Sequence, residues 1–105
     1  MGRSQRAKGN RGELEVVHIL NEHGIDSRRG NVFYREPDIM DDTEIHWEVK
    51  RCEKTEIGKW YRQSCEQGRG KIPVVVHRRS REDWMITMKF EDFLRLWKGE
   101  ANGKD

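Results

Sequence analysis

Apolar and polar positions indicate a helix over residues 10–22. Its apolar stripe consists of Val16, Val17 and Leu20. These three recur at the spacing of a single helix face. Asn10 is a suitable N-cap, and Gly24 is a natural C-terminal stop. The pattern therefore predicts a first helix that begins near Asn10 and follows a basic, mobile tail at residues 1–9.

Five short segments carry the signals of β-strands: residues 25–29, 38–40, 44–51, 72–76 and 84–89. The third of them has an apolar face and a polar face, because side chains alternate along a strand. The apolar face consists of Ile45, Trp47 and Val49, and the polar face of His46, Glu48 and Lys50. A turn at residues 41–43 separates this segment from the second one. We therefore expect a hairpin that places Asp38 opposite residues 46–48.

Two further helices are expected, one between Thr55 and Gly68 and one over residues 90–98. Their inward positions are predicted to be Ile57, Trp60, Tyr61 and Ser64 in one and Phe93, Leu94 and Trp97 in the other. The order α-β-β-β-α-β-β-α predicts an α/β fold, with a mixed central sheet flanked by helices in a single domain over residues 10–99. The polar residues 100–105 are expected to form a disordered tail.

Individual aromatic residues carry further expectations. Trp47, Trp84 and Trp97 match inward positions and are expected in the core or an interface. For Trp60, a role as an exposed ring on which a nucleobase could stack remains open. His46 shares a strand face with Glu48, and an exposed edge position is expected for it.

Charge is the main feature of the composition. Charged residues make up 38% of the 105 residues, but the formal net charge is only +2. Residues 36–48 are mostly acidic and residues 69–81 mostly basic. The N-terminal residues add Arg3, Arg6, Lys8 and Arg11. An acidic pocket with basic flanks suits a polyanion held around a cation, although an ordinary charged surface has the same composition.

Cys52 and Cys65 are too few for a disulfide framework and lack the spacing of metal ligands. We expect both to be reduced thiols in a cytoplasmic protein. No segment is long or apolar enough for a signal peptide or a membrane span, so no association with membranes is expected.

Asp38, Glu48 and Lys50 form the candidate site. An isolated Glu-x-Lys would indicate only a solvated strand face in so charged a chain. Asp38 changes this interpretation, because the expected hairpin would hold its carboxylate close to that of Glu48. Two ionised carboxylates at close range repel each other unless a cation binds between them or the pKa of one is raised. Mg²⁺ fits best, since it prefers oxygen ligands and is usually held by one or two carboxylates beside phosphates. Glu13, on the apolar stripe of the first helix, either reaches solvent or approaches the same ion.

Such a group is suited to phosphodiester hydrolysis. Lys50 would orient the nucleophile or neutralise charge that builds up on the phosphate, and the sequence leaves both roles open. It also leaves open whether one or two ions bind.

Short motifs then resemble, in order and spacing, those of archaeal Holliday-junction resolvases of the PD-(D/E)xK nuclease superfamily. They are Lys8-Gly9-Asn10-Arg11-Gly12-Glu13-Leu14-Glu15, His23-Gly24-Ile25, Arg28-Arg29-Gly30, Pro37-Asp38-Ile39, Glu48-Val49-Lys50 and Ile72-Pro73-Val74. The later part of the chain is more similar to small phage-encoded nucleases described as resolvases. The resemblance implies a restriction-endonuclease-like fold and a bacterial, archaeal or phage-infected host cell.

The resemblance also implies roles for single residues. Asp38, Glu48 and the Val49 carbonyl would bind Mg²⁺, for which Mn²⁺ could substitute. Glu13 would bind the ion or its water, and Lys50 would be catalytic.

DNA contacts are implied as well, and the residues expected to make them are Arg6, Lys8, Arg11, Arg29 and Gln63. Arg29 would contact the phosphate near the cut. For the N-terminal basic residues, phosphate contact and a merely solubilising tail both remain open. Trp60 and Gln63 depart from the archaeal pattern, and Gln63 is expected beside the site.

The resulting prediction is an Mg²⁺-dependent endonuclease that resolves branched DNA as a homodimer. The expected interface consists of Trp60, Tyr61 and the helix at residues 90–98. The alternatives are a nicking, flap or single-strand nuclease of the same fold, and a non-catalytic DNA-binding module, against which the intact Asp38, Glu48 and Lys50 argue.

Overall fold

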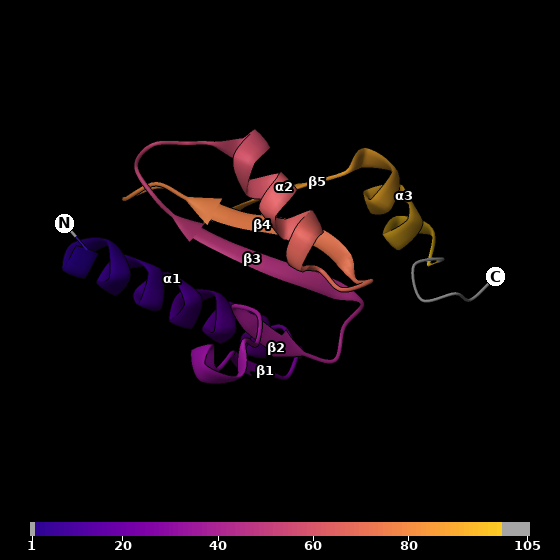
Figure 1. Ribbon diagram of the computed structural model, residues 1–105. Coiled ribbons are helices and arrows are strands. Elements are labelled where there is room, and N and C mark those ends of the chain that lie inside the picture. Colours follow the sequence, from indigo (N-terminus) through magenta and orange to yellow (C-terminus); the bar gives the residue numbers. More distant parts are fainter. Residues whose placement is uncertain (1, 100–105) are drawn as a thin grey trace.

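The structure is a computed structural model that describes residues 2–99, with side chains from Asn10 onward. Three α-helices, a short 3₁₀ helix and five strands follow one another in this part of the chain (Figure 1). In chain order they are α1 (Gly2–Glu22), β1 (Ser27–Arg29), η1 (Val32–Tyr34), β2 (Ile39–Asp41), β3 (Ile45–Arg51), α2 (Ile57–Gln67), β4 (Ile72–Arg78), β5 (Met85–Met88) and α3 (Phe90–Lys98). The predicted α/β fold, with helices around a mixed sheet, is confirmed.

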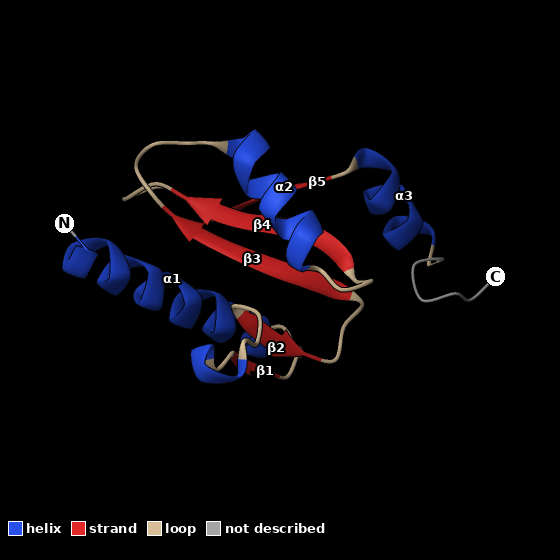
Figure 2. Cartoon of the chain, in the orientation of Figure 1, coloured by secondary structure: helices blue, strands red, loops and turns tan. Residues whose placement is uncertain are grey.

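The strands β3, β4 and β5 form the central mixed sheet (Figure 2). β3 runs parallel to β4, with Glu48 beside Val75, and β4 pairs antiparallel with β5. A parallel pair needs a crossover connection, which α2 supplies. β1 and β2 form a separate antiparallel ladder that places Ser27 beside Asp41.

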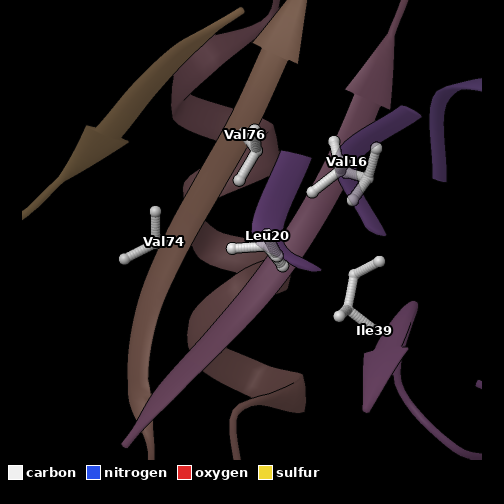
Figure 3. Close-up of a cluster of buried hydrophobic side chains, with 6 residues drawn as sticks. Val16, Leu20, Ile39, Val74 and Val76 are labelled. Carbon is white, nitrogen blue, oxygen red and sulfur yellow. The ribbon is translucent and has the colours of Figure 1, made fainter. Parts of the chain in front are cut away.

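Helices pack on both faces of the central sheet (Figures 1 and 3). The core cluster on the α1 side consists of Val16, Leu20, Ile39, Val49, Val74 and Val76. Each fully buried Val or Leu stabilises the fold by roughly 1.5–3 kcal/mol. On the other face, α2 buries Trp60 and Ser64. Because side chains alternate, Glu48 points to the α2 side while its neighbour Val49 joins the core.

Helix α1 begins at Gly2 rather than near Asn10, so the expected start of the first helix is wrong and residues 2–9 are helical. The stretch contains Gln, Arg, Ala and Lys, which are good helix formers, and a glycine within a helix costs only about 1 kcal/mol relative to Ala. These residues therefore extend the helix past the favourable cap at Asn10. Residues 1 and 100–105, including the expected C-terminal tail, lie outside the described residues.

The expected hairpin of β2 and β3 is also wrong, since β2 pairs with β1 instead. The side chain of Asp41 redirects the chain between β2 and β3. It accepts hydrogen bonds from the N–H and hydroxyl of Thr43 and from Trp47 Nε1. The carboxylate of Asp41 is engaged in this way, and the backbone of β2 is paired to β1. As a result, β2 lies beside β3 without forming a ladder to it.

Two aromatic residues of α3 differ from expectation. Trp97 is 78% exposed and Phe93 is 42% exposed, so their predicted inward positions are wrong. The reason is that α3 lies beyond β5 at the end of the sheet, where its apolar stripe has little of the described chain to pack against (Figure 1). Trp60 is 5% exposed, which confirms its inward helix position and removes it as a surface for bases. No helix within residues 2–99 is long and apolar enough to cross a membrane.

Candidate active site

Asp38 lies just before β2, and its side chain reaches β3. Its Oδ2 accepts a hydrogen bond of 3.0 Å from the N–H of Val49. The bond satisfies a backbone donor of β3 that would otherwise be buried without a partner. Asp38 therefore meets the part of β3 that the sequence indicated, through a side chain rather than through a hairpin.

Glu48 is the buried carboxylate of the site and is only 2% exposed. Its Oε1 lies 3.4 Å from His46 Nε2, and its Oε2 lies 3.6 Å from Lys50 Nζ. All three side chains share one face of β3, as the alternation predicted. His46 is only 3% exposed, however, so its expected exposed position is wrong. The reason is that α2 packs over this face, and a carboxylate buried there needs polar partners to offset its desolvation.

Several negative charges converge on Asp38. Burial and the charge of Glu48 raise the pKa of Asp38 to about 7, and the charge of Glu13 adds to this rise. The hydrogen bond from Val49 and the charge of Lys50 act in the opposite direction. The carboxyl group of Asp38 is therefore costly to ionise near neutral pH unless another positive charge comes close.

Glu13 and Arg29 form an ion pair at the edge of this group. Arg29 Nε donates a hydrogen bond of 3.0 Å to Glu13 Oε1, and Arg29 Nη2 donates one of 3.0 Å to Asn10 Oδ1. Arg29 thereby fixes the end of β1 against α1. The pair also explains how a carboxylate is tolerated on the apolar stripe of α1, because it is both partly solvated and paired.

A cleft of about 470 Å³ opens above Asp38 and Glu48. It lies between the loop connecting β1 to β2 and the helix α2, and its lining includes Val32, Arg35, Gln63 and Arg69. Gln63 is thus placed beside the two carboxylates, as expected from its position in the second helix. The cleft gives a substrate access to carboxylates that are otherwise enclosed.

Gly30 is required by the close approach of two chain segments beside the site. A Cβ at this position would lie 1.7 Å from the carbonyl oxygen of Pro37. The N–H of Gly30 donates a hydrogen bond of 3.0 Å to the carbonyl of Asp38. The glycine therefore allows the segment that carries Arg29 to lie against the segment that carries Asp38.

The residues present fit a small divalent cation in their chemistry. Asp38, Glu48 and the carbonyl of Val49 offer hard oxygen donors, and burial together with the charges of Glu48 and Glu13 raises the pKa of Asp38, so a cation would favour its ionised form. Among the described residues, no group of three or more His, Cys, Asp or Glu side chains is arranged to hold a metal ion. Mg²⁺ suits such a sparse set, because it keeps several waters and commonly takes only one or two carboxylates.

The other expected DNA-binding residues are less defined. Arg11 is exposed on α1, whereas the side chains of Arg6 and Lys8 lie outside the described set. Cys52 and Cys65 are both exposed, and neither forms a disulfide bond.

Sequence reasoning overlooked the lining of the cleft by Arg35 and Arg69, and the exposed aromatic residues of η1. The apolar triplet Val32–Tyr34 between Gly30 and Pro37 was the available signal, because a loop rarely carries three large apolar residues without a reason.

Comparison with solved structures identifies a protein with a similar fold. The Holliday junction resolvase Hjc of Archaeoglobus fulgidus, an archaeal hyperthermophile, superimposes with a TM-score of 0.59 over 77% of this chain and 72% of the resolvase, at 22% sequence identity. The protein therefore has the α/β fold of an archaeal Holliday junction resolvase, which confirms the fold implied by the motifs. No model of a known protein family matches the sequence. No curated protein sequence matches it either.

Proposed function

We propose that the protein is an Mg²⁺-dependent DNA endonuclease that cuts branched DNA as a homodimer. The observation that carries the proposal is the hydrogen bond from Val49 to Asp38, which brings Asp38 to Glu48 and Lys50 on β3. Two carboxylates and a lysine at the base of an open cleft are suited to phosphodiester hydrolysis. The fold shared with a Holliday junction resolvase supports the choice of DNA as substrate.

Asp38, Glu48 and the Val49 carbonyl would hold the ion. When bound, Mg²⁺ would polarise a phosphate oxygen and lower the pKa of a water molecule. Lys50 keeps its ammonium group 3.6 Å from Glu48, where it can stabilise negative charge that develops on the phosphate. His46 holds the other oxygen of Glu48 and so fixes the orientation of this carboxylate.

Arg29 has a double role in this proposal. Its Nε neutralises Glu13, which limits the negative charge around Asp38. Its side chain is 34% exposed, so it can also meet a phosphate beside Glu13.

The dimer is supported by apolar surface at the far end of the sheet. The exposed large side chains there are Met85, Ile86, Phe90, Phe93 and Trp97. They continue from β5, the edge strand of the sheet, onto α3. A twofold dimer would bury this surface and supply the two sites that paired cuts require. Trp60 is buried within the chain and is therefore removed from the expected interface.

The decisive experiment is a cleavage panel of four-way, flap, linear duplex and single-stranded DNA, with Mg²⁺ or with EDTA. The proposal expects metal-dependent cutting that is fastest on branched DNA. Metal binding has an independent readout, because Mg²⁺ should raise the melting temperature of the wild-type protein at pH 8 but not that of Asp38→Asn. Full cleavage in EDTA would refute the proposal, and strong DNA binding without any cleavage would favour a non-catalytic binding module.

A further inference from the structure

The loop between β1 and β2 presents three adjacent apolar side chains to solvent. Val32, Phe33 and Tyr34 are 83%, 95% and 77% exposed. They occupy η1, none of whose residues is buried. A loop that exposes two aromatic rings and a valine in succession forgoes the stabilisation that burying them would bring. This arrangement calls for a binding partner.

The loop is held in place by hydrogen bonds of its own. Asn31 Oδ1 accepts from the N–H of Phe33 at 2.9 Å, and the N–H of Arg35 donates to the carbonyl of Val32 at 3.0 Å. Arg35 takes a left-handed backbone conformation with φ of 55°, which turns the chain back toward Pro37. The aromatic side chains are thus presented from an ordered turn, so little entropy need be lost when they bind.

Glu36 stabilises the base of this turn. Its carboxylate accepts a hydrogen bond of 2.8 Å from the N–H of Asn31 and forms an ion pair with Arg28. The two charged groups lie beside each other at the base of the loop. Their contact leaves the apolar side chains of the turn as the part that projects outward.

The position of the loop identifies the partner. Val32 and Arg35 line the same cleft as Asp38 and Glu48. Arg69 crosses from the other side and donates to the carbonyl of Arg35 at 3.4 Å. Phe33 and Tyr34 lie in sequence between the two lining residues of the loop, and the cleft itself has two exposed arginine residues, Arg35 and Arg69, that suit a polyanion.

We propose that Phe33 and Tyr34 stack on a nucleobase next to the phosphate in the cleft, so that the loop selects DNA whose base stacking is interrupted. In a continuous duplex the faces of the bases are covered by their neighbours. At a junction, a flap or a single strand, a face becomes available, and an aromatic ring binds it with little regard to sequence. The inference rests on the proposed nuclease function and names the feature of the DNA that the site would recognise.

The test measures DNA affinity in EDTA, where binding is separate from cleavage. Fluorescence anisotropy compares a four-way junction, a flap, a single strand and a linear duplex of the same sequence. Phe33→Ala and Tyr34→Ala should each weaken binding to the interrupted DNAs by roughly five- to a hundredfold, the range expected when one stacked base is released. Binding to linear duplex should change less than about twofold, since no base face is available there.

Matched variants separate stacking from general apolar contact. Phe33→Leu keeps an apolar side chain but lacks the flat ring, and it should resemble Phe33→Ala. Phe33→Trp should retain the selectivity. Leu14→Ala removes a side chain that is 53% exposed on α1 rather than on the loop, and it should leave all four affinities unchanged.

Several results would overturn the inference. Equal losses of affinity on all four DNAs, or no loss on any of them, would contradict it. So would a wild-type protein without preference for interrupted DNA. A changed sedimentation coefficient of the loop variants in the absence of DNA would instead assign the loop to contact with a second copy of the chain. If selectivity depends on Phe33 but the wild type cuts no DNA in Mg²⁺, the nuclease proposal fails and the loop inference stands. If the wild type cuts branched DNA and the loop variants behave like it, the loop inference alone fails.

Discussion

The N–H of Val49 donates a hydrogen bond of 3.0 Å to the carboxylate of Asp38. This single contact joins a residue outside the central sheet to its strand β3, where Glu48 and Lys50 flank Val49 in sequence. The site therefore depends on the position of β2 as much as on β3. Because the bond uses the backbone of Val49, a change of side chain at position 49 would leave it in place.

The first prediction concerns cleavage. Asp38→Asn, Glu48→Gln and Lys50→Ala should each slow metal-dependent DNA cleavage by about 100-fold or more, because each removes a metal ligand or a charge that stabilises the reacting phosphate. Single-turnover cleavage of a labelled junction measures the effect. Asp42→Asn, an exposed carboxylate in the turn before β3, is the matched control and should cut normally. A wild-type cleavage rate in Glu48→Gln would refute the assignment of Glu48 to the active site.

The second prediction concerns pH and stability. Asp38 has a pKa of about 7 in the folded protein, raised from an ordinary value of 3.8. The folded state thus keeps a proton that the unfolded chain releases. Ionisation of Asp38 should therefore lower the free energy of unfolding as the pH rises from about 4 to 7, with the full penalty above pH 7.

Asp38→Asn removes this penalty and can still accept the hydrogen bond from Val49. In EDTA, the variant should exceed the wild type in stability at pH 8 by on the order of a few kcal/mol and match it near pH 4. Urea unfolding at the two pH values measures the difference. An advantage that is the same at both would show that charge at Asp38 is not its cause.

The third prediction concerns the close approach at Gly30. Gly30→Ala should reduce the free energy of unfolding by roughly 1–3 kcal/mol, because the new Cβ collides with the backbone of Pro37 and the segments must separate. Cleavage should fall as well, since Asp38 follows Pro37. Gly58→Ala on α2 meets only the flexible end of Arg62 at 3.6 Å and should be neutral or slightly stabilising. Equal effects of the two substitutions would argue against the close approach.

The fourth prediction concerns the basic N-terminal residues. A chain that begins at Gly9 lacks Arg3, Arg6 and Lys8, and its DNA affinity should depend less steeply on salt. The slope of log affinity against log salt should fall by up to about 2.7, or roughly 0.9 for each phosphate that the shortened chain no longer neutralises. Anisotropy titrations on linear duplex in EDTA provide the slope. An unchanged slope would show that these residues do not contact DNA phosphates and serve only to keep the protein in solution.

The fifth prediction concerns the dimer. Sedimentation at micromolar concentration should give a dimer for the wild type and a monomer for Trp97→Glu, because a charge placed in an apolar interface is costly to bury. Trp97 is 78% exposed in the single chain, so the substitution should not disturb folding. Leu14→Glu tests whether any new surface charge has the same effect, and it should remain dimeric. A monomeric wild type, with and without DNA, contradicts the prediction.

The sequence by itself determined the order of the helices and strands and the pairing of Glu48 with Lys50 on one face of β3. Both follow from local periodicity, since alternation along a strand and the stripe on a helix depend only on neighbouring residues. The motif order also indicated the fold that the resolvase structure shares. The start of α1 was the exception, because adjacent helix formers competed with a good cap at Asn10.

Tertiary structure alone decided the surroundings of these residues. It paired β2 with β1, buried His46 under α2, and left Trp97 and Phe33 exposed. It also set the pKa of Asp38 through burial and through charges from α1 and β3. These properties depend on segments that are distant in sequence, and both desolvation and electrostatic repulsion arise only when folding brings such segments together.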